Sequence, residues 1–437
     1  MRLTEPPAQP TRTVAASLLT AVLAGALLTG CPGTATGSPV IAADPSVALV
    51  DEPVRIRVSG LAPGVEVVVS SRMTDEAEQG WGSSATFRSD RTGTVDLTRD
   101  SPTSGSYQGN DGMGLFWSML PDGQDEDRFD AAPAVEPPTP PGGFTVALSV
   151  TVAGREVASS EVVRKWTGAE VDHRTVDLDT DGLVGDLFRP GDEVPADRPA
   201  VLLLSGSDGG VRNYDAVLLA AHGYPALALA YFAHPGLPPT LRDVPLEYLA
   251  TAARLLATDL SNGPRPLVVI GYSRGAEAAL LLAQWQPDLV QATVLYAPTD
   301  VVGGGFPDGG DAWTWQGDPI PPTRIPLDRI TGPVLAIAGA DDPVWPRQVL
   351  DGSAAAARRI VGDLATRARP GPHHALIYPE AGHGVGTFPH LPLPIRLQHP
   401  VTGQPVETGG TRAANEAARR DSWRHLLDFL RTVPGPQ

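Results

Sequence analysis

The stretch that most constrains the fold runs from Pro266 to Trp285 and reads PLVVIGYSRGAEAALLLAQW. Its first part, Leu267 to Ile270, is apolar and mostly β-branched, which is typical of a short strand buried on both faces of a parallel sheet. Its last part, Ala276 to Gln284, consists of strong helix formers. A buried strand that leads directly into a helix predicts a parallel sheet covered by helices in this part of the chain.

The five residues between strand and helix, GYSRG, match the G-x-S-x-G pattern of a nucleophile elbow. Glycines on either side of Ser273 let the strand and the helix pass without a Cβ clash, and the sharp turn lifts the hydroxyl clear of the sheet. Glycine and serine also occur in ordinary turns, so the pattern gains its weight from the strand before it and the helix after it. We therefore predict that Ser273 is a catalytic nucleophile.

A serine nucleophile needs a histidine to take its proton and an acid to orient that histidine. In this architecture the acid and then the histidine follow the serine along the chain. The stretch GPVLAIAGADDPVWP is an apolar strand followed by Asp341 and Asp342, and ALIYPEAGHGVG is a strand followed by His383. Carboxyl ends of parallel strands meet at one sheet edge, where ligands bind. We predict a triad of Ser273, Asp342 and His383, with Asp341 as the alternative acid.

A glycine-rich turn follows another apolar strand in AVLLLSGSDGG, from Ala200 to Gly210. The tetrahedral intermediate of acyl transfer needs two backbone N–H donors, one from the residue after the nucleophile and one from such a loop. We assign the two oxyanion-hole donors to Arg274 and Ser207, with Asp208 as the alternative to Ser207. Phosphate binding is the weaker interpretation, because the P-loop Lys-Ser/Thr pair and a spaced G-x-G-x-x-G are missing.

The remaining histidines lack the strand-then-glycine setting of His383. Four of them, His373, His374, His390 and His399, are expected at the surface or in loops. Their spacing does not match that of zinc ligands, so we predict neither a metal site nor a cofactor. The aromatic residues Phe306, Trp313 and Trp315 lie in the glycine-rich GGGFPDGGDAWTW, where they either line an acyl pocket or pack a loop onto the core.

The first thirty residues differ in kind from the rest. Arg2 and Arg12 precede a short apolar run that ends in LLTGC at Cys31, the single cysteine among 437 residues. This order is typical of a secretory signal, and Leu-Thr-Gly-Cys resembles a bacterial lipobox. We expect residues 1–30 to be a signal peptide, Cys31 to be lipid-modified and residues 31–40 to be a tether. The protein is then an exported lipoprotein anchored to the extracytoplasmic side of the cell membrane, although a different cleavage point or an uncleaved anchor stays open.

The remainder of the chain changes its pattern once. Residues 41–168 contain short alternating strands with turn signals at Gly60 to Gly64 and at Asp90 to Gly93, which predicts a β-sandwich. Residues 169–437 alternate strands with helices, which predicts a mostly parallel sheet. A formal net charge of −17 argues against a nucleic-acid partner, because that would call for a basic patch. No protein partner is identifiable from the sequence.

Together these motifs resemble the family of acyl-CoA thioesterases and bile acid-CoA:amino acid N-acyltransferases. In that family an immunoglobulin-like N-terminal domain precedes an α/β-hydrolase domain. The resemblance covers about Ser46 to the C-terminus and rests on VDEPVRIRVSGLAPG, GSYQGNDGMGLFWSML, YFAHPGLPPTLRDVPLEYL, GYSRGAE, GADDPVWP, YPEAGHG and GGTRAANEAARRDSWRHLLDFL. The family's triad, carried over onto the matching positions, falls on Ser273, Asp342 and His383.

The resemblance implies cleavage of an acyl thioester or ester through an acyl-enzyme. In the resembled family the hydrolases carry serine at the elbow and the amino-acid transferases carry cysteine, so Ser273 favours hydrolysis. Acyl transfer to an amine acceptor and ligand binding by a non-catalytic surface lipoprotein are the alternatives. Family members mostly work inside cells, whereas this chain carries an export signal. This difference weakens the inference that the substrate is a CoA ester, but it does not affect the inference that the reaction is acyl transfer.

Overall fold

The computed structural model describes residues 37–433 except 77, 125–141, 169, 192–194, 196–197, 259–264, 346–350 and 368–371. The predictions for the signal peptide, for Cys31 and for the first part of the tether therefore lie outside the described residues. Within the described ranges, every helix is too short or too polar to cross a lipid bilayer.

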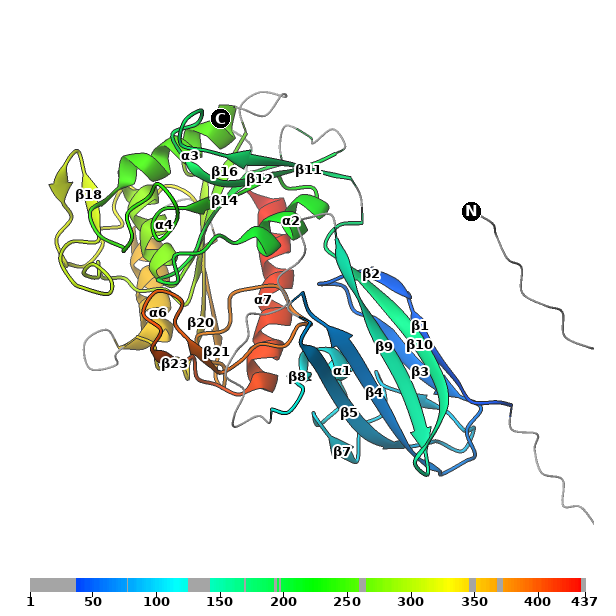
Figure 1. Ribbon diagram of the computed structural model, residues 1–437. Helices are drawn as coiled ribbons and strands as arrows, with labels where there is room; N and C mark the ends of the chain where they lie inside the picture. The colour runs from blue at the N-terminus through cyan, green and yellow to red at the C-terminus, as the bar shows by residue number, and fades with distance from the viewer. Residues whose placement is uncertain are drawn as a thin grey trace, which may run out of the picture. The chain divides into compact units, whose positions relative to one another are not determined.

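The described residues between 40 and 165 form two β-sheets (Figure 1). Their elements are β1 (Val40–Asp44), β2 (Val47–Leu49), β3 (Arg55–Ser59), β4 (Glu66–Thr74), β5 (Gly80–Arg88), β6 (Val95–Asp96), β7 (Ser104–Gly105), α1 (Gly114–Trp117), β8 (Leu120–Pro121), β9 (Gly143–Val152) and β10 (Arg155–Lys165). The smaller sheet has the order β1-β3-β6, and the larger has the order β2-β10-β9-β4-β5-β7 with β8 paired to β5. Inward-facing side chains of both sheets, such as Ile56, Phe87 and Val150, share one hydrophobic cluster. The two sheets thus have a common core, while an immunoglobulin-like identity stays a prediction.

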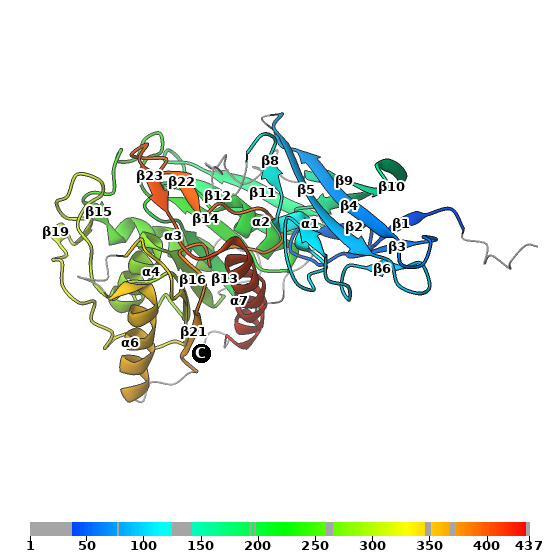
Figure 2. The ribbon, with the colours of Figure 1, turned by 90° about the horizontal axis from the view of Figure 1, so that it is seen from below.

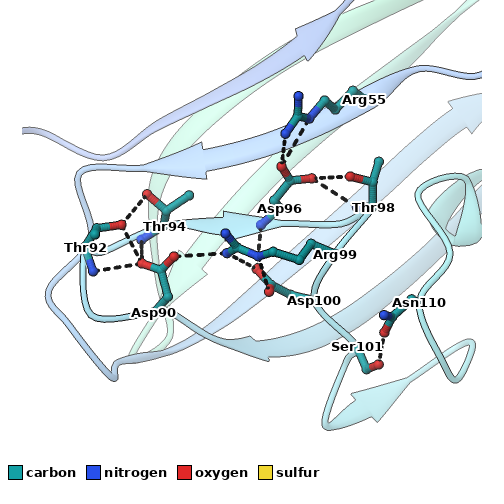
Figure 3. Close-up of polar contacts among 10 residues, drawn as sticks. All are labelled: Arg55, Asp90, Thr92, Thr94, Asp96, Thr98, Arg99, Asp100, Ser101 and Asn110. Carbon is teal, nitrogen blue, oxygen red and sulfur yellow. Dashed lines mark hydrogen bonds and ion pairs between the residues drawn. The ribbon is translucent and has the colours of Figure 1, made fainter.

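Polar contacts fix the turn that passes the chain from β5 in the larger sheet to β6 in the smaller one (Figure 3). Asp90 accepts hydrogen bonds from the backbone N–H groups of Thr92 and Thr94 at 2.9 and 3.0 Å. Gly93 has a φ of 72°, a conformation that glycine adopts without a steric penalty. Hydrogen bonds from Thr92 and Thr94 hold the pKa of the Asp90 carboxyl well below its usual range. The turn therefore lies where the sequence predicts it.

The C-terminal part of the chain is built on one eight-stranded sheet. Its strands are β11 (Val171–Val176), β12 (Val184–Pro190), β13 (Ala200–Leu204), β14 (Ala226–Ala230), β16 (Leu267–Tyr272), β17 (Ala292–Tyr296), β20 (Val334–Gly339) and β21 (His374–Tyr378). They are ordered β11-β12-β14-β13-β16-β17-β20-β21, with β12 antiparallel to both neighbours and all strands from β14 to β21 parallel. This order, with one antiparallel strand and one exchanged pair, is that of the α/β-hydrolase fold.

Helices cover both faces of this sheet (Figure 1). They are α2 (Asn213–Ala221), α3 (Leu246–Thr258), α4 (Arg274–Trp285), α6 (Gly352–Thr366) and α7 (Arg412–Thr432). Helices α3, α4 and α6 bury apolar side chains in one cluster, and α2 and α7 bury theirs in another on the opposite face. Strands β13, β14, β17 and β20 are buried at every residue, as expected for strands covered on both sides.

Two small sheets lie outside the central one. The first joins β15 (Val244–Pro245), β18 (Trp313–Trp315) and β19 (Asp318–Pro319), and the second is a hairpin of β22 (Arg396–Gln398) and β23 (Pro405–Glu407). Figure 2 shows this hairpin as a pair of orange arrows apart from the central strands. The apolar patterns in the sequence indicate neither small sheet, because the strands of both sheets are only two or three residues long.

The N-terminal sheets contact the C-terminal part of the chain through hydrogen bonds and apolar packing. The guanidinium of Arg412, at the start of α7, donates to the carbonyl oxygens of Trp117, Ser118 and Met119 at 3.0, 3.4 and 2.7 Å. Trp166, just after β10, is fully buried in the cluster formed by α2 and α7. The chain just after the last N-terminal strand thus contributes to the core of the C-terminal part.

Candidate active site

Ser273 occupies a strained turn between β16 and α4. Its φ of 54° and ψ of −116° lie outside the regions that residues with a side chain favour, and such strain tends to persist at functional sites. The two glycines beside it are sterically required. A Cβ on Gly271 would lie 2.0 Å from the carbonyl oxygen of Gly275, and one on Gly275 would lie 2.3 Å from that of Leu204. Strand and helix therefore pass each other in the way that the G-x-S-x-G pattern predicts.

Asp342 and His383 form a buried hydrogen-bonded pair at the carboxyl ends of β20 and β21. Oδ2 of Asp342 lies 2.8 Å from Nδ1 of His383, and the two residues are 2% and 6% exposed. The same oxygen accepts from the Ser353 hydroxyl at 2.7 Å, and Oδ1 accepts from the Val344 N–H at 2.9 Å. Asp341 is exposed at the surface. Of the two aspartates left open by the sequence, the structure brings Asp342 to the histidine.

His383 is held beside the serine elbow by its neighbours. The hydroxyl of Tyr272, the residue before Ser273, donates to the His383 carbonyl oxygen at 2.6 Å, and the two rings lie 5.2 Å apart. The His383 N–H donates to the Thr408 carbonyl at 2.6 Å, and the Trp345 ring packs 6.5 Å from the imidazole. The structure therefore gathers all three residues of the predicted triad at one sheet edge.

The loop after β13 approaches the serine closely. A Cβ on Gly206 would lie 3.2 Å from the Cβ of Ser273, so the backbone at Gly206 lies against the Ser273 side chain. Arg274 is the first residue of α4, and the N–H groups at a helix start have no partner within the helix. The assignment of Arg274 and Ser207 as oxyanion donors agrees with these positions and stays a prediction.

The side chain of Arg274 is anchored beneath the glycine-rich loop 302–312. It forms an ion pair with Glu277 at 3.2 Å and donates to the carbonyl oxygens of Gly303 and Gly304 at 3.2 and 3.0 Å. Glu277 in turn accepts from the indole N–H of Trp313 at 2.7 Å. Burial raises the pKa of Glu277 to about 7. Trp313 is fully buried in the core, so packing rather than pocket lining accounts for it.

The four histidines expected at the surface or in loops lie there, but two of them, His390 and His399, are buried within their loops. His374 is exposed and His373 is half-buried. His390 is 2% exposed, with Nδ1 3.0 Å from Glu416, and His399 is 9% exposed, with Nε2 3.0 Å from the Ser207 hydroxyl. The partners of His390 and His399 lie 26 and 192 residues away in the chain, so no local sequence pattern predicts that these two histidines are buried. Within the described ranges, no three His, Cys, Asp or Glu side chains are grouped to hold a metal ion.

A cavity of about 230 Å³ opens beside the elbow. Tyr272 and Gly384, which adjoin Ser273 and His383, form part of its wall together with the apolar side chains of Val211, Phe388 and Leu391. Arg212, which also lines the cavity, is paired with Asp215 at 2.8 Å. The space next to the predicted triad is thus mainly apolar, and its buried charges are already matched.

The strand order and the serine-bearing elbow define the class of this protein as an α/β hydrolase. Residues 51–178 match the model for the acyl-CoA thioester hydrolase/BAAT N-terminal region, and residues 312–434 match that for the BAAT/acyl-CoA thioester hydrolase C-terminal region. The chain belongs to this family of acyl-CoA thioester hydrolases and BAAT proteins.

Individual relatives cover nearly the whole chain. Acyl-coenzyme A thioesterase 6 of Mus musculus is 32% identical over 87% of this chain and 93% of its own length. Acyl-coenzyme A amino acid N-acyltransferase 1 of Mus musculus is 30% identical over 89% of this chain and 96% of its own. Acyl-coenzyme A thioesterase 6 of Homo sapiens is 30% identical over 87% and 93%. The family thus contains both hydrolases and transferases by name.

Proposed function

We propose that the protein is a serine acyl hydrolase that cleaves acyl thioesters or esters through an acyl-enzyme. The observation that carries the proposal is the buried hydrogen bond between Asp342 and His383 beside the strained Ser273. A pair of this kind is what turns a serine hydroxyl into a nucleophile. The likeness to acyl-coenzyme A thioesterase 6 supports a thioester as the bond that is cleaved.

In the proposed reaction, Ser273 Oγ attacks the acyl carbon while Nε2 of His383 takes the hydroxyl proton. Asp342 keeps the proton of Nδ1 in place and stabilises the imidazolium. The developing oxyanion accepts hydrogen bonds from the backbone N–H groups of Arg274 and Ser207. The bond to the thiol or alcohol then breaks, and His383 gives its proton to that leaving group. Water, deprotonated by His383, attacks the acyl-enzyme and releases the free acid.

A serine-directed fluorophosphonate probe followed by a panel of p-nitrophenyl esters and acyl-CoAs tests this function. We expect the wild type to be labelled and to hydrolyse part of the panel, and we expect Ser273→Ala to lose both properties while keeping its melting temperature. Loss of a triad residue typically lowers the rate by orders of magnitude. Turnover by Ser273→Ala above about a tenth of wild type would overturn the proposal.

Acyl transfer is separated from hydrolysis by the products. A serine acyl-enzyme is an oxygen ester, which water activated by His383 opens, whereas the thioester of a cysteine acyl-enzyme is more readily opened by an amine. We therefore expect the wild type to release free acid even with glycine or taurine in excess. Mass spectrometry of the products decides the matter, and an N-acyl amino acid as the main product would place the protein with the transferases.

We further propose that the protein is exported and anchored to a membrane through lipid on Cys31. The supporting observation is the order of basic residues, apolar run and LLTGC at the start of the sequence. One acyl chain anchors a protein only weakly, so several chains are expected on the mature N-terminus. Cys31→Ser should leave the precursor uncleaved by the lipoprotein signal peptidase or release it to the medium. An unmodified Cys31 in membrane-associated protein, found by intact mass, would contradict this.

A further inference from the structure

A second histidine contacts the loop that follows β13. The hairpin of β22 and β23 carries His399 in its turn, and Nε2 of this residue lies 3.0 Å from the hydroxyl of Ser207. The ring packs against Phe306 of the glycine-rich loop, with 4.9 Å between ring centroids. His399 therefore connects two loops that adjoin the serine elbow, and the mechanism above does not use it.

The hydrogen bonds of His399 define its protonation state. Nδ1 faces the backbone N–H of Val401 at 3.3 Å, so Nδ1 accepts and carries no proton. The proton of the neutral ring is then on Nε2, which donates to Ser207 Oγ. The backbone around it is fixed as well, because the His399 N–H donates to the Gln404 carbonyl at 2.8 Å and its carbonyl accepts from Gly403 at 2.7 Å. His399 is thus a rigidly held donor.

The backbone of the loop that receives this hydrogen bond is held by Tyr231 and by contacts within the loop. The Tyr231 hydroxyl donates to the Ser205 carbonyl at 2.6 Å, and the Ser205 hydroxyl donates to the Gly210 carbonyl at 2.5 Å. Among the described residues, His399 is the hydrogen-bond partner of the Ser207 side chain. Because an oxyanion donor works only when its N–H points at the developing charge, a small shift at Ser207 would weaken catalysis.

We propose that His399 is a positioning residue, whose neutral imidazole holds Ser207 so that the backbone N–H of this loop stays aimed at the oxyanion. This role rests on the proposed hydrolase function. The full rate of turnover then requires two neutral histidines. His383 must be neutral to take the proton of Ser273, and His399 must be neutral to keep its contacts with Val401 and Ser207.

Protonation of His399 would break this arrangement. A proton on Nδ1 would face the N–H of Val401, and two donors cannot bond each other. Burial lowers the pKa of His399, and the nearby charge of Asp208 on the same loop acts in the opposite direction. Phe306 on the glycine-rich loop is uncharged, and Arg396 and Glu407 of the hairpin are paired with each other at 3.1 Å. The ring is therefore neutral near pH 7 and becomes charged only in acid.

The dependence of kcat/KM on pH tests the proposal. Protonation of His383 removes the general base and gives the acid limb of log kcat/KM a slope of 1. Protonation of His399 weakens catalysis without abolishing it, so it makes the limb steeper than 1 over the range in which His399 titrates. We expect the acid limb of the wild type to steepen above a slope of 1 and that of His399→Gln to keep a slope of 1, because the glutamine amide still donates to Ser207 but does not titrate. At pH 8 His399→Gln should retain activity within about threefold, whereas His399→Ala should lower kcat about tenfold, less than the 10²–10³ of a lost oxyanion donor. The exposed His374→Gln serves as the matched control with a wild-type profile.

Several outcomes overturn the proposal. An acid slope in His399→Gln equal to that of the wild type would show that titration of His399 does not affect the rate. A kcat of His399→Ala within twofold of wild type would show that the contact between His399 and Ser207 does not affect catalysis. The rate of fluorophosphonate labelling separates these failures from failure of the function itself. If the wild type is labelled and His399→Ala is labelled at the same rate, the positioning role is contradicted but the hydrolase function is not. If the wild type is neither labelled nor active, both the hydrolase function and the positioning role are contradicted.

Discussion

At the scale of single residues, the environment of Asp342 distinguishes it from its neighbour. Asp342 accepts hydrogen bonds from three groups and is 2% exposed, whereas Asp341 is exposed. We expect Asp342→Asn to lower kcat by about 10³–10⁴, because the histidine loses its orienting charge and its tautomer changes. Asp341→Asn should change kcat by less than about threefold, since it removes only a solvated charge. Steady-state kinetics of the two variants measures the contrast, and the opposite ranking would make Asp341 the acid.

The residues that the sequence predicted and those that it missed differ in one physical respect. Ser273, Asp342 and His383 each follow a strand whose apolar run is visible in the sequence, so chain order alone leads to them. His399 and Ser353 hold their partners through contacts between separate loops and helices, which leave no periodic pattern. A glycine-rich loop in the sequence indicates where the backbone donors of an oxyanion hole lie. The sequence does not indicate which distant side chain holds that loop in position.

At the scale of elements, two helical glycines have opposite steric surroundings. A Cβ on Gly275 in α4 would lie 2.3 Å from the backbone carbonyls of Leu204 and Ser205, whereas one on Gly362 in α6 would meet no atom within 4 Å. Gly275→Ala should therefore destabilise the fold by about 1–3 kcal/mol, as overpacking does, and displace the elbow. Gly362→Ala should stabilise it by up to about 1 kcal/mol, because alanine loses less backbone entropy in a helix.

Thermal unfolding together with probe labelling checks this pair of substitutions. We expect the melting temperature to fall and labelling of Ser273 to slow in Gly275→Ala. Gly362→Ala should melt slightly higher and label at the wild-type rate. Equal stability of the two variants would contradict the steric argument, since both replace glycine by alanine within a helix.

The central strands and the helices after them were predictable because each repeats a simple pattern over several residues. The strand expected at Leu267 to Ile270 extends to Tyr272, and the helix expected at Ala276 to Gln284 begins at Arg274. Both elements are longer than expected at the end that meets the elbow. The sequence there contains glycine and serine, so the apolar pattern does not extend to it. The β22–β23 hairpin, by contrast, was missed, because its strands are three residues long and polar.

At the scale of the whole molecule, one carboxylate links the N-terminal sheets to two helices of the C-terminal part. Asp51, just after β2, accepts hydrogen bonds from Nε2 of His222 at 2.6 Å and from the indole N–H of Trp423 at 2.7 Å. His222 lies at the end of α2 and Trp423 lies in α7. Burial raises the pKa of Asp51, but the hydrogen bond and charge of His222 outweigh it and lower the pKa overall. Burial lowers the pKa of His222, but Asp51 outweighs it and raises that pKa.

These two shifts make the junction sensitive to pH in a defined direction. The raised pKa of His222 adds stability that is fully present below 6.5, its ordinary value, and is lost as the pH rises through the folded value. The lowered pKa of Asp51 adds stability that is present above 3.8 and is lost as the pH falls through the folded value. The pair therefore stabilises the molecule most between about pH 4 and 6.5.

Asp51→Asn isolates this contribution. It should lower the free energy of unfolding by about 1–3 kcal/mol near pH 6, the usual cost of leaving a buried polar partner unsatisfied. The difference from wild type should shrink as the pH rises from 6 to 9, because the wild type loses its His222 cation over that range while the variant has no carboxylate to hold it. Unfolding curves at several pH values measure the difference, with the exposed Asp172→Asn as a control. A difference that stays constant across this range would mean that the charge of His222 does not contribute to the stability that Asp51 gives this junction.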